Sequence, residues 1–200
     1  KTLLVADHID EAQRTFIYAK EIGYNYLNIE ERLYTFTWIK FNNFDQVLNN
    51  FYASYFAGAL VIPRKLIKRN IDSFLAKPKL DKAFLAGIKN SYNASPESLY
   101  QRLTNILPND YQLENLFFLR LGHKGGSNRF EITKELHLTH QHSPHGNETN
   151  EKYCRRWVSI RVLQDIAKSS EEHLMDVQVS HYPADGMSYL IFSSATVDPF

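Results

Sequence analysis

Apolar residues recur at helical spacing in the first half of the chain. In residues 9–29 the pattern follows Asp10, a residue type that caps helix N-termini, and in residues 44–63 it ends at a proline. Between them, residues 32–41 form a short stretch rich in β-branched and aromatic side chains, which is compatible with a strand. These patterns predict two amphipathic helices that flank an extended segment.

A further helical pattern occupies residues 77–108. Ser95 and Pro96 suit the cap and the first position of a helix, and apolar residues follow at helical spacing. Pro108 is expected to stop that helix, because proline lacks the N–H group that would continue the hydrogen-bond ladder. The segment therefore predicts two short helices in a helix-turn-helix-like arrangement, which is common and does not by itself indicate DNA binding.

The composition changes near residue 109, where shorter apolar stretches rich in β-branched residues replace the helical pattern. Asp185 and Gly186 form a favourable hairpin turn between two such stretches. The expected order is two strands, a helix and two more strands, at residues 114–121, 129–132, 154–168, 175–182 and 187–197. Strands that bracket a helix predict a small α+β domain.

Composition is typical of a globular protein in water. The 200 residues are 44% apolar, which is enough for a core, and no apolar run is long enough to cross a bilayer. The single cysteine, Cys154, cannot form an internal disulfide and fits a reducing compartment, so we expect a cytoplasmic protein. The chain begins at Lys1 without a start methionine, and we expect it to be part of a longer protein.

Positive charge is concentrated in residues 64–89. This segment carries Arg64, Lys65, Lys68, Arg69, Lys77, Lys79, Lys82 and Lys89 against Asp72 and Asp81, whereas the whole chain has a net charge of only +1. Such a basic segment can meet phosphate groups. The alternative is a solvated helical face, because no aromatic or arginine pattern typical of nucleic-acid binding accompanies it.

The helix predicted at residues 9–29 contains the frame of a zinc-peptidase helix without its ligands. Such a helix needs two metal ligands four residues apart, with a glutamate between them that activates water. Glu21 lies in that frame, but the ligand positions hold Lys20 and Tyr24. An ammonium repels Zn²⁺ and tyrosine is a weak ligand, so we expect a structural helix without metal.

Two segments of the first half resemble the ImmA/IrrE-type metallopeptidase-like domain. Members carry an Arg-x-Phe-x-x-Ala-His-Glu-x-x-His helix and a second helix that ends in a Phe-Ala-x-x-Leu-Leu-x-Pro pattern. This chain matches them at Arg14, Phe16, Ala19, Glu21 and Gly23, and at Ala53, Phe56, Ala57, Leu60 and Pro63. The family's third ligand, a glutamate about one turn before the alanine, is replaced by Asn50. The resemblance implies a degenerate site whose metal positions hold Lys20, Tyr24 and Asn50, next to Glu21.

The second half is similar to the C-terminal region of short-chain fatty acyl regulators, which are bacterial XRE-type transcription factors. Cys154 and Trp157 match the family's Cys-Pro-x-Trp motif, in which Arg155 replaces the proline, and Asp185 and Gly186 match its late hairpin. The resemblance implies a GAF-like ligand-sensing fold and an effector of the short-chain acyl-CoA class. It also implies a homodimer that binds DNA through a helix-turn-helix domain absent from this chain.

The start of the helix predicted at 154–168 supplies the expected effector-binding residues, Cys154, Arg156 and Trp157. A guanidinium group beside an aromatic ring can hold a phosphate or a carboxylate. The alternatives are an exposed arginine pair on a capping turn and a half-buried thiol without chemistry. Cys154 as a nucleophile is disfavoured, because nothing at local spacing supplies a base.

Two other segments carry candidate chemistry. Clustered imidazoles such as His137, His140, His142 and His145 can bind zinc, nickel or copper, although incidental histidines in an exposed loop are the favoured interpretation. The glycine-rich stretch at residues 122–127 could cradle a phosphate. It does not lead into a clear helix N-terminus, so a hairpin turn is favoured.

Together these observations predict an α+β fold in three segments. Residues 1–76 are expected to form a degenerate metallopeptidase-like domain, residues 77–108 a helical hairpin, and residues 109–200 a GAF-like ligand-sensing domain. The predicted protein is the regulatory part of an XRE-type transcription regulator that binds an acyl effector, is not an enzyme, and needs no cofactor, metal or membrane. The alternatives are a zinc peptidase with unusual ligands and a ligand-free domain that contacts nucleic acid or a protein.

Overall fold

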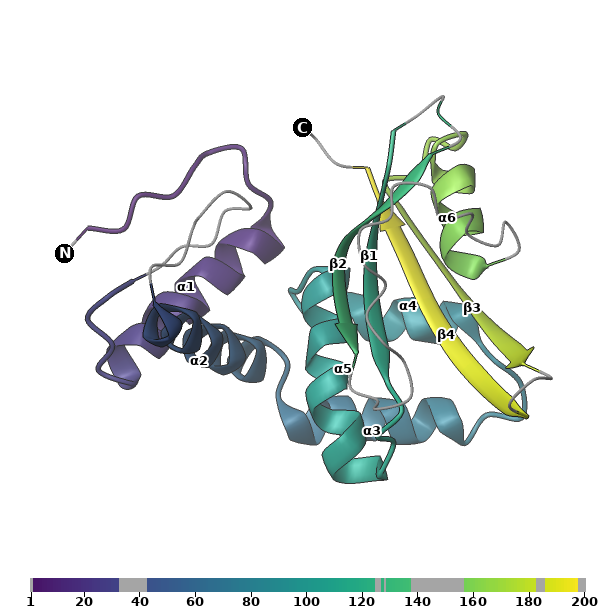
Figure 1. Ribbon diagram of the computed structural model, residues 1–200, viewed down its shortest axis with the longest axis horizontal. Coiled ribbons are helices and arrows are strands. Elements are labelled where there is room, and N and C mark those ends of the chain that lie inside the picture. Colours follow the sequence, from purple (N-terminus) through teal and green to yellow (C-terminus); the bar gives the residue numbers. More distant parts are fainter. Residues whose placement is uncertain are drawn as a thin grey trace. The chain divides into compact units, whose positions relative to one another are not determined.

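The fold is mixed α+β and divides into two compact units. The computed structural model describes residues 2–32, 43–124, 127, 129–137, 157–182 and 186–197, and these form six helices and two antiparallel two-stranded sheets (Figure 1). The first unit comprises Lys1–Ala76 and Gly87–Tyr111, and the second comprises Lys77–Ala86 and Gln112–Phe200. The predicted α+β class is therefore confirmed.

Helices build the first unit. They are α1 (Glu11–Tyr26), α2 (Phe44–Val61), α3 (Arg64–Leu75), the end of α4 (Lys82–Asn90) and α5 (Pro96–Tyr111). Asp10 caps α1 in a reciprocal capping box with Gln13, and Asn43 caps α2. The helices predicted near residues 9–29, 44–63 and 77–108 are confirmed, whereas residues 33–42, with most of the strand suggested for 32–41, lie outside the described residues.

Small residues let α1 and α2 pack closely side by side (Figure 1). Ala19 of α1 and Ala53 and Ala57 of α2 are buried at the contact. A Cβ atom added at Gly23 would lie 3.0 Å from Cδ1 and 3.2 Å from Cβ of Phe56. The glycine is therefore required for the close approach of the two helices at this point.

The prediction that Pro108 stops its helix is wrong, because α5 continues to Tyr111. Proline removes one backbone hydrogen bond, a loss that is small in the last turn of a helix. That turn is held from outside, since Asp110 and Tyr111 bind side chains of α3. Tertiary contacts thus extend the helix one turn beyond the point that local chemistry indicates.

Two hairpins and a helix form most of the second unit. β1 (Phe117–His123) pairs with β2 (Phe130–His137), β3 (His173–Tyr182) pairs with β4 (Met187–Thr196), and α6 (Val158–Ile166) covers the second hairpin (Figure 1). The core between α6 and this hairpin consists of Val158, Val162, Ile166 and Ala195. Gly186 has a positive φ of 68° at the turn before β4, as the predicted Asp-Gly hairpin requires. The four strands and the helix expected after residue 109 are confirmed.

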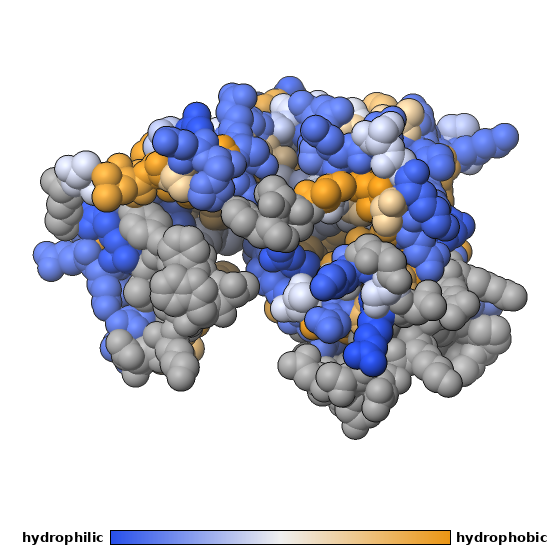
Figure 2. Space-filling view, turned by 90° about the horizontal axis from the view of Figure 1, so that it is seen from above, coloured by the Kyte–Doolittle hydropathy of each residue, from blue (hydrophilic) through white to orange (hydrophobic). Residues whose placement is uncertain are grey.

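Some apolar side chains remain exposed on the helices. On α2 these include Phe44, Val47, Phe51, Tyr52, Tyr55 and Leu60. The space-filling view likewise shows hydrophobic surface among hydrophilic residues on the face that it draws (Figure 2). Within the described ranges, no helix combines the length and the apolar character needed to cross a membrane.

Candidate functional site

Lys20 and Asn50, two of the three positions that the resemblance assigns to metal ligands, come into direct contact. Lys20 lies on α1 and Asn50 on α2, and Lys20 Nζ donates a hydrogen bond of 2.6 Å to Asn50 Oδ1. Tyr24, one turn after Lys20, is fully buried, and the ammonium lies 5.7 Å from the centre of its ring. The packing of α1 on α2 thus gathers side chains that are 30 residues apart in sequence.

The ammonium of Lys20 is largely desolvated. Its side chain belongs to a residue that is only 4% exposed, and burial lowers its pKa from 10.5 to about 8. At neutral pH the group still carries its proton, so a positive charge occupies the space between the two helices. A second cation, such as a divalent metal ion, would be repelled from this point.

Glu21, the position of the catalytic glutamate in the resemblance, is engaged by an arginine. Arg32 Nε lies 2.9 Å from Glu21 Oε1 and 3.1 Å from Oε2, and Asn25 Nδ2 donates to Oε1 at 3.0 Å. Arg32 also donates to Asn25 Oδ1, which closes a three-residue network. Both carboxylate oxygens of Glu21 are therefore occupied by an ion pair within the protein.

The chemistry of these side chains does not suit a divalent metal ion. An ammonium, a phenol and an amide oxygen already bound by that ammonium replace the imidazole and carboxylate ligands that zinc prefers. In the parts of the chain that the structure describes, no group of three or more His, Cys, Asp and Glu residues could hold a metal ion. What the arrangement can do is hold α1 and α2 together through a polar contact in a largely apolar interface.

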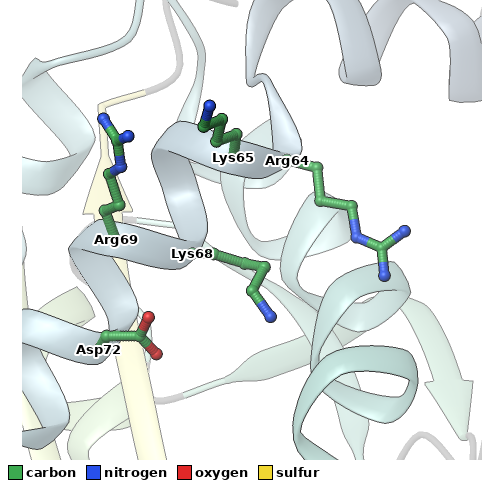
Figure 3. A pocket seen from close by; sticks show the side chains of 5 residues that line it. All are labelled: Arg64, Lys65, Lys68, Arg69 and Asp72. Atoms are coloured by element: carbon green, nitrogen blue, oxygen red, sulfur yellow. The ribbon is translucent and has the colours of Figure 1, made fainter.

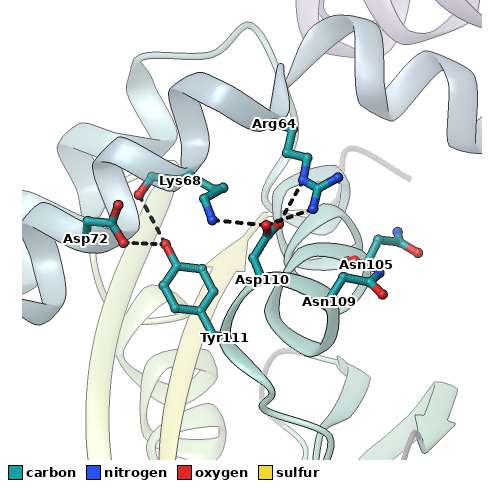
Figure 4. A network of polar contacts seen from close by, with 7 residues as sticks. All are labelled: Arg64, Lys68, Asp72, Asn105, Asn109, Asp110 and Tyr111. Atoms are coloured by element: carbon teal, nitrogen blue, oxygen red, sulfur yellow. Dashed lines mark hydrogen bonds and ion pairs between the residues drawn. The ribbon is translucent and has the colours of Figure 1, made fainter.

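A second polar network joins α3 to the end of α5 (Figure 4). Arg64 Nη2 lies 2.7 Å from Asp110 Oδ1, Arg64 Nε lies 2.9 Å from Oδ2, and Lys68 Nζ lies 3.0 Å from Oδ1. The hydrogen bonds from these two cations lower the pKa of Asp110 to about 2. Tyr111 donates to Asp72 Oδ1 at 2.6 Å, and its pKa is raised by burial and by that carboxylate.

Sequence reasoning missed this network. It counted Arg64 and Lys68 as members of a basic segment and placed Asp110 beyond the end of a helix. Arg64 and Asp110 are 46 residues apart, so no local spacing could reveal their contact. The sequence shows only that cations are in excess in this segment. Such cations must either pair with anionic side chains or remain hydrated.

Of the expected effector residues, the structure describes Trp157. It is half-buried and precedes α6, where its backbone carbonyl accepts a hydrogen bond from Arg161 N. Cys154 and Arg156 lie outside the described residues, as do His140, His142 and His145. In the glycine-rich stretch at residues 122–127, Gly122 and His123 belong to β1 and pair with β2, as expected of a hairpin, whereas residues 125 and 126 lie outside the described residues.

No family model, no curated protein and no solved structure matches this chain. The resemblance to the metallopeptidase-like domain and to the acyl regulators therefore stays a prediction, and it rests on the residues quoted above. The geometry around Lys20 is an independent observation on the same positions.

Proposed function

We propose that this chain is the regulatory part of a bacterial XRE-type transcription regulator, working in the cytoplasm. In this proposal the N-terminal half is a metallopeptidase-like scaffold without catalytic activity. The second half is a GAF-like sensor for a short-chain acyl effector, and a DNA-binding helix-turn-helix domain belongs to the rest of the protein.

The single observation that carries the proposal is the contact between Lys20 and Asn50. The resemblance assigns both residues to metal positions, and their side chains meet at 2.6 Å in the interface between α1 and α2. A buried ammonium is destabilising unless its surroundings compensate for lost hydration, so its presence at this point calls for an explanation. A scaffold that kept its helix packing and replaced its metal by an internal cation explains it.

The proposed mechanism is a shift between conformations. An effector that binds one conformation of the second unit more tightly than another changes the population of the two. The half-buried Trp157 at the start of α6 supplies an apolar surface for an acyl chain, and Arg156 would meet its anionic end. The exposed aromatic side chains of α2 offer an apolar surface for a homodimer.

Binding of the effector is tested with the full chain, a set of short-chain acyl-CoAs and free fatty acids, thermal denaturation and calorimetry. A true effector raises the melting temperature with increasing concentration, because it binds only the folded state. Arg156→Gln should weaken that effect, whereas Lys168→Gln, which removes the same charge after α6, should not. The sensor assignment fails if no compound stabilises the protein, or if both variants lose binding equally.

Elemental analysis separates the scaffold from the alternative, a zinc peptidase with unusual ligands. The purified chain should contain no stoichiometric zinc. If it holds one equivalent that is lost in Glu21→Ala, the chain is a metalloenzyme and the proposal is wrong.

The proposal of a former metal site is tested directly by restoring the zinc ligands. The triple variant Lys20→His, Tyr24→His and Asn50→Glu should bind about one zinc ion, because it returns ligands with the chemistry that zinc prefers. A matched control puts the histidines at Tyr18 and Ile22, which have the same spacing but lie exposed on α1. A folded triple variant that binds zinc no better than this control would remove the main support for a former metal site.

A further inference from the structure

One face of α3 carries a concentration of positive charge, which we call the basic face: Arg64, Lys65, Lys68 and Arg69. Together with Asp72 these residues line an open pocket of about 430 Å³ (Figure 3). Ile67, Ile71 and Phe74 on the opposite face of the helix are buried, so packing fixes which side faces outward. Figure 3 shows Lys65 and Arg69 extending on one side of α3, and Arg64 and Lys68 on the side toward α5.

The four cations of the basic face differ in their partners. Arg64 and Lys68 share the carboxylate of Asp110. Lys65 and Arg69 are exposed and form no ion pair within the described ranges. The basic face therefore presents two cations, one helical turn apart, whose charges are not paired by any residue that the structure describes.

This arrangement is electrostatically unfavourable in the isolated protein. Lys65 and Arg69 are like charges at i and i+4, and Lys65 lies in the first turn, where the helix dipole disfavours cations. The first turn of α3 contains no acidic residue, and its cap Pro63 makes no side-chain hydrogen bond. An anion bound to the basic face would relieve both sources of repulsion.

We propose that the basic face binds the phosphodiester backbone of a nucleic acid, with Lys65 and Arg69 as the principal contacts. Backbone contacts of this type use exposed lysine and arginine and need no reading of bases. Arg64 and Lys68 add positive potential, although Asp110 already occupies their hydrogen bonds. The inference does not depend on the acyl effector or on the lost metal site.

The lining of the basic face disfavours other anionic partners. A membrane-surface helix inserts a continuous apolar side, but Ile67, Ile71 and Phe74 of α3 are buried within the protein, and only Leu66 and Leu75 remain exposed. A protein interface has an apolar centre without charged residues, and a small-molecule site is largely enclosed, whereas this pocket is open and all five residues that line it carry charges. Repeated phosphates along a flexible strand fit an open cationic surface best.

The test measures binding of labelled duplex DNA and single-stranded RNA to the full chain by fluorescence anisotropy between 50 and about 200 mM salt. Affinity should fall as salt increases, because each neutralised phosphate releases counterions. Lys65→Gln with Arg69→Gln should weaken binding at least about fivefold at the lowest salt and reduce the salt slope by about 2. A preference for duplex or single strand identifies which nucleic acid the basic face takes.

The matched control is Lys79→Gln with Lys89→Gln, which removes two charges from the same basic segment but outside the pocket lining. The proposal is supported if only the α3 variant loses binding while its circular dichroism stays unchanged. It is overturned if the two variants weaken binding equally, if binding does not depend on salt, or if neither nucleic acid binds at low salt. Equal or tighter binding of poly-glutamate, or of phosphatidylserine vesicles, would also overturn it.

Discussion

Two lysines of the first unit show how burial changes the meaning of a charge. Lys20 on α1 and Lys68 on α3 each donate from Nζ to a side-chain oxygen of another helix, at 2.6 Å and 3.0 Å. Lys20 is 4% exposed and its partner there is the neutral amide of Asn50. The side chain of Lys68 is 35% exposed and its partner is the carboxylate of Asp110.

The pKa values in the two regions report opposite energetic effects. Between α1 and α2, desolvation lowers the pKa of Lys20, so the charged form is disfavoured by folding. Between α3 and α5, the two cations lower the pKa of Asp110, so the charged form is favoured. The contact around Lys20 therefore specifies which helix positions meet, while the network around Asp110 adds stability directly.

The largest expected effect is a rise in stability with pH that originates at Lys20. The pKa of Lys20 is about 8 in the folded protein and 10.5 as a free group. Between these values the unfolded state binds more protons than the folded state, so the free energy of unfolding increases with pH. The full change is about 3 kcal/mol, because a tenfold difference in proton affinity corresponds to roughly 1.4 kcal/mol. Urea unfolding at pH 7, 8, 9 and 10 measures most of this rise, which is complete only above pH 10.5.

The control replaces the polar pair by an apolar one, in Lys20→Met with Asn50→Leu. This variant should lose the pH-dependent rise and be more stable than the natural sequence at pH 7, because apolar replacements of buried charges often stabilise by about 1–4 kcal/mol. An identical pH profile in both proteins would show that Lys20 is not desolvated and would erase the contrast with Lys68.

A smaller effect is expected from the packing that brings Lys20 to Asn50. In Gly23→Ala the new Cβ meets Phe56, including its Cβ at 3.2 Å, which cannot move without its helix. We expect a loss of about 1–2 kcal/mol in the free energy of unfolding, measured by chemical denaturation, because overpacking forces the two helices apart. Gly58→Ala is the control, since nothing lies within 4 Å of its Cβ position, and it should gain about 0.5–1 kcal/mol in helix propensity. If Gly23→Ala and Gly58→Ala change the free energy of unfolding equally, α1 and α2 do not approach closely at Gly23.

A weaker effect still is expected for Asp110→Asn, because its partners are partly exposed to solvent. Asp110 has a folded pKa of about 2, below its ordinary value near 4, so its contribution is complete above about pH 4. The contribution is lost as the pH falls through about 2. The stability difference between the natural protein and the variant should therefore be constant from pH 7 to about 4 and vanish near pH 2. If the stability difference between the two proteins persists at pH 2, it comes from packing and not from the charge of Asp110.

The smallest effect is expected for Lys65→Gln, which removes from the basic face a charge that has no ion-pair partner in the described part of the chain. Relief of repulsion from Arg69 should raise stability by only a few tenths of a kcal/mol. Thermal denaturation at low and high salt detects it, and the gain should disappear at high salt because exposed charges are screened. A loss of stability would show that Lys65 has a structural partner.

Much of the local structure followed from residue patterns. Asp10 caps the helix that begins beside it, and Gly186 takes the positive φ that its hairpin turn needs. Pro108 misled the prediction because its own chemistry opposes a helix, whereas the contacts of Asp110 and Tyr111 with α3 lie outside any local window. The candidate site could likewise be predicted only in part. The unsuitable ligand types at Lys20 and Tyr24 are visible in the sequence, but the contact between Lys20 and Asn50 is not.

The sequence by itself indicated most of the helices and strands, although not α3 or the end of α5, because caps, turns and periodicity act over a few residues. It also showed that Lys20 and Tyr24 are poor ligand types for a metal, because that depends on residue chemistry alone. Only the tertiary structure decided which charges are buried and which are paired. Arg32 reaches Glu21 from the segment after α1, Lys20 reaches Asn50 across two helices, and Asp110 takes two of the four cations of α3. Desolvation and ion pairing depend on neighbours brought together by packing, so the fold also decides that Lys65 and Arg69 form no ion pair with the residues that the structure describes.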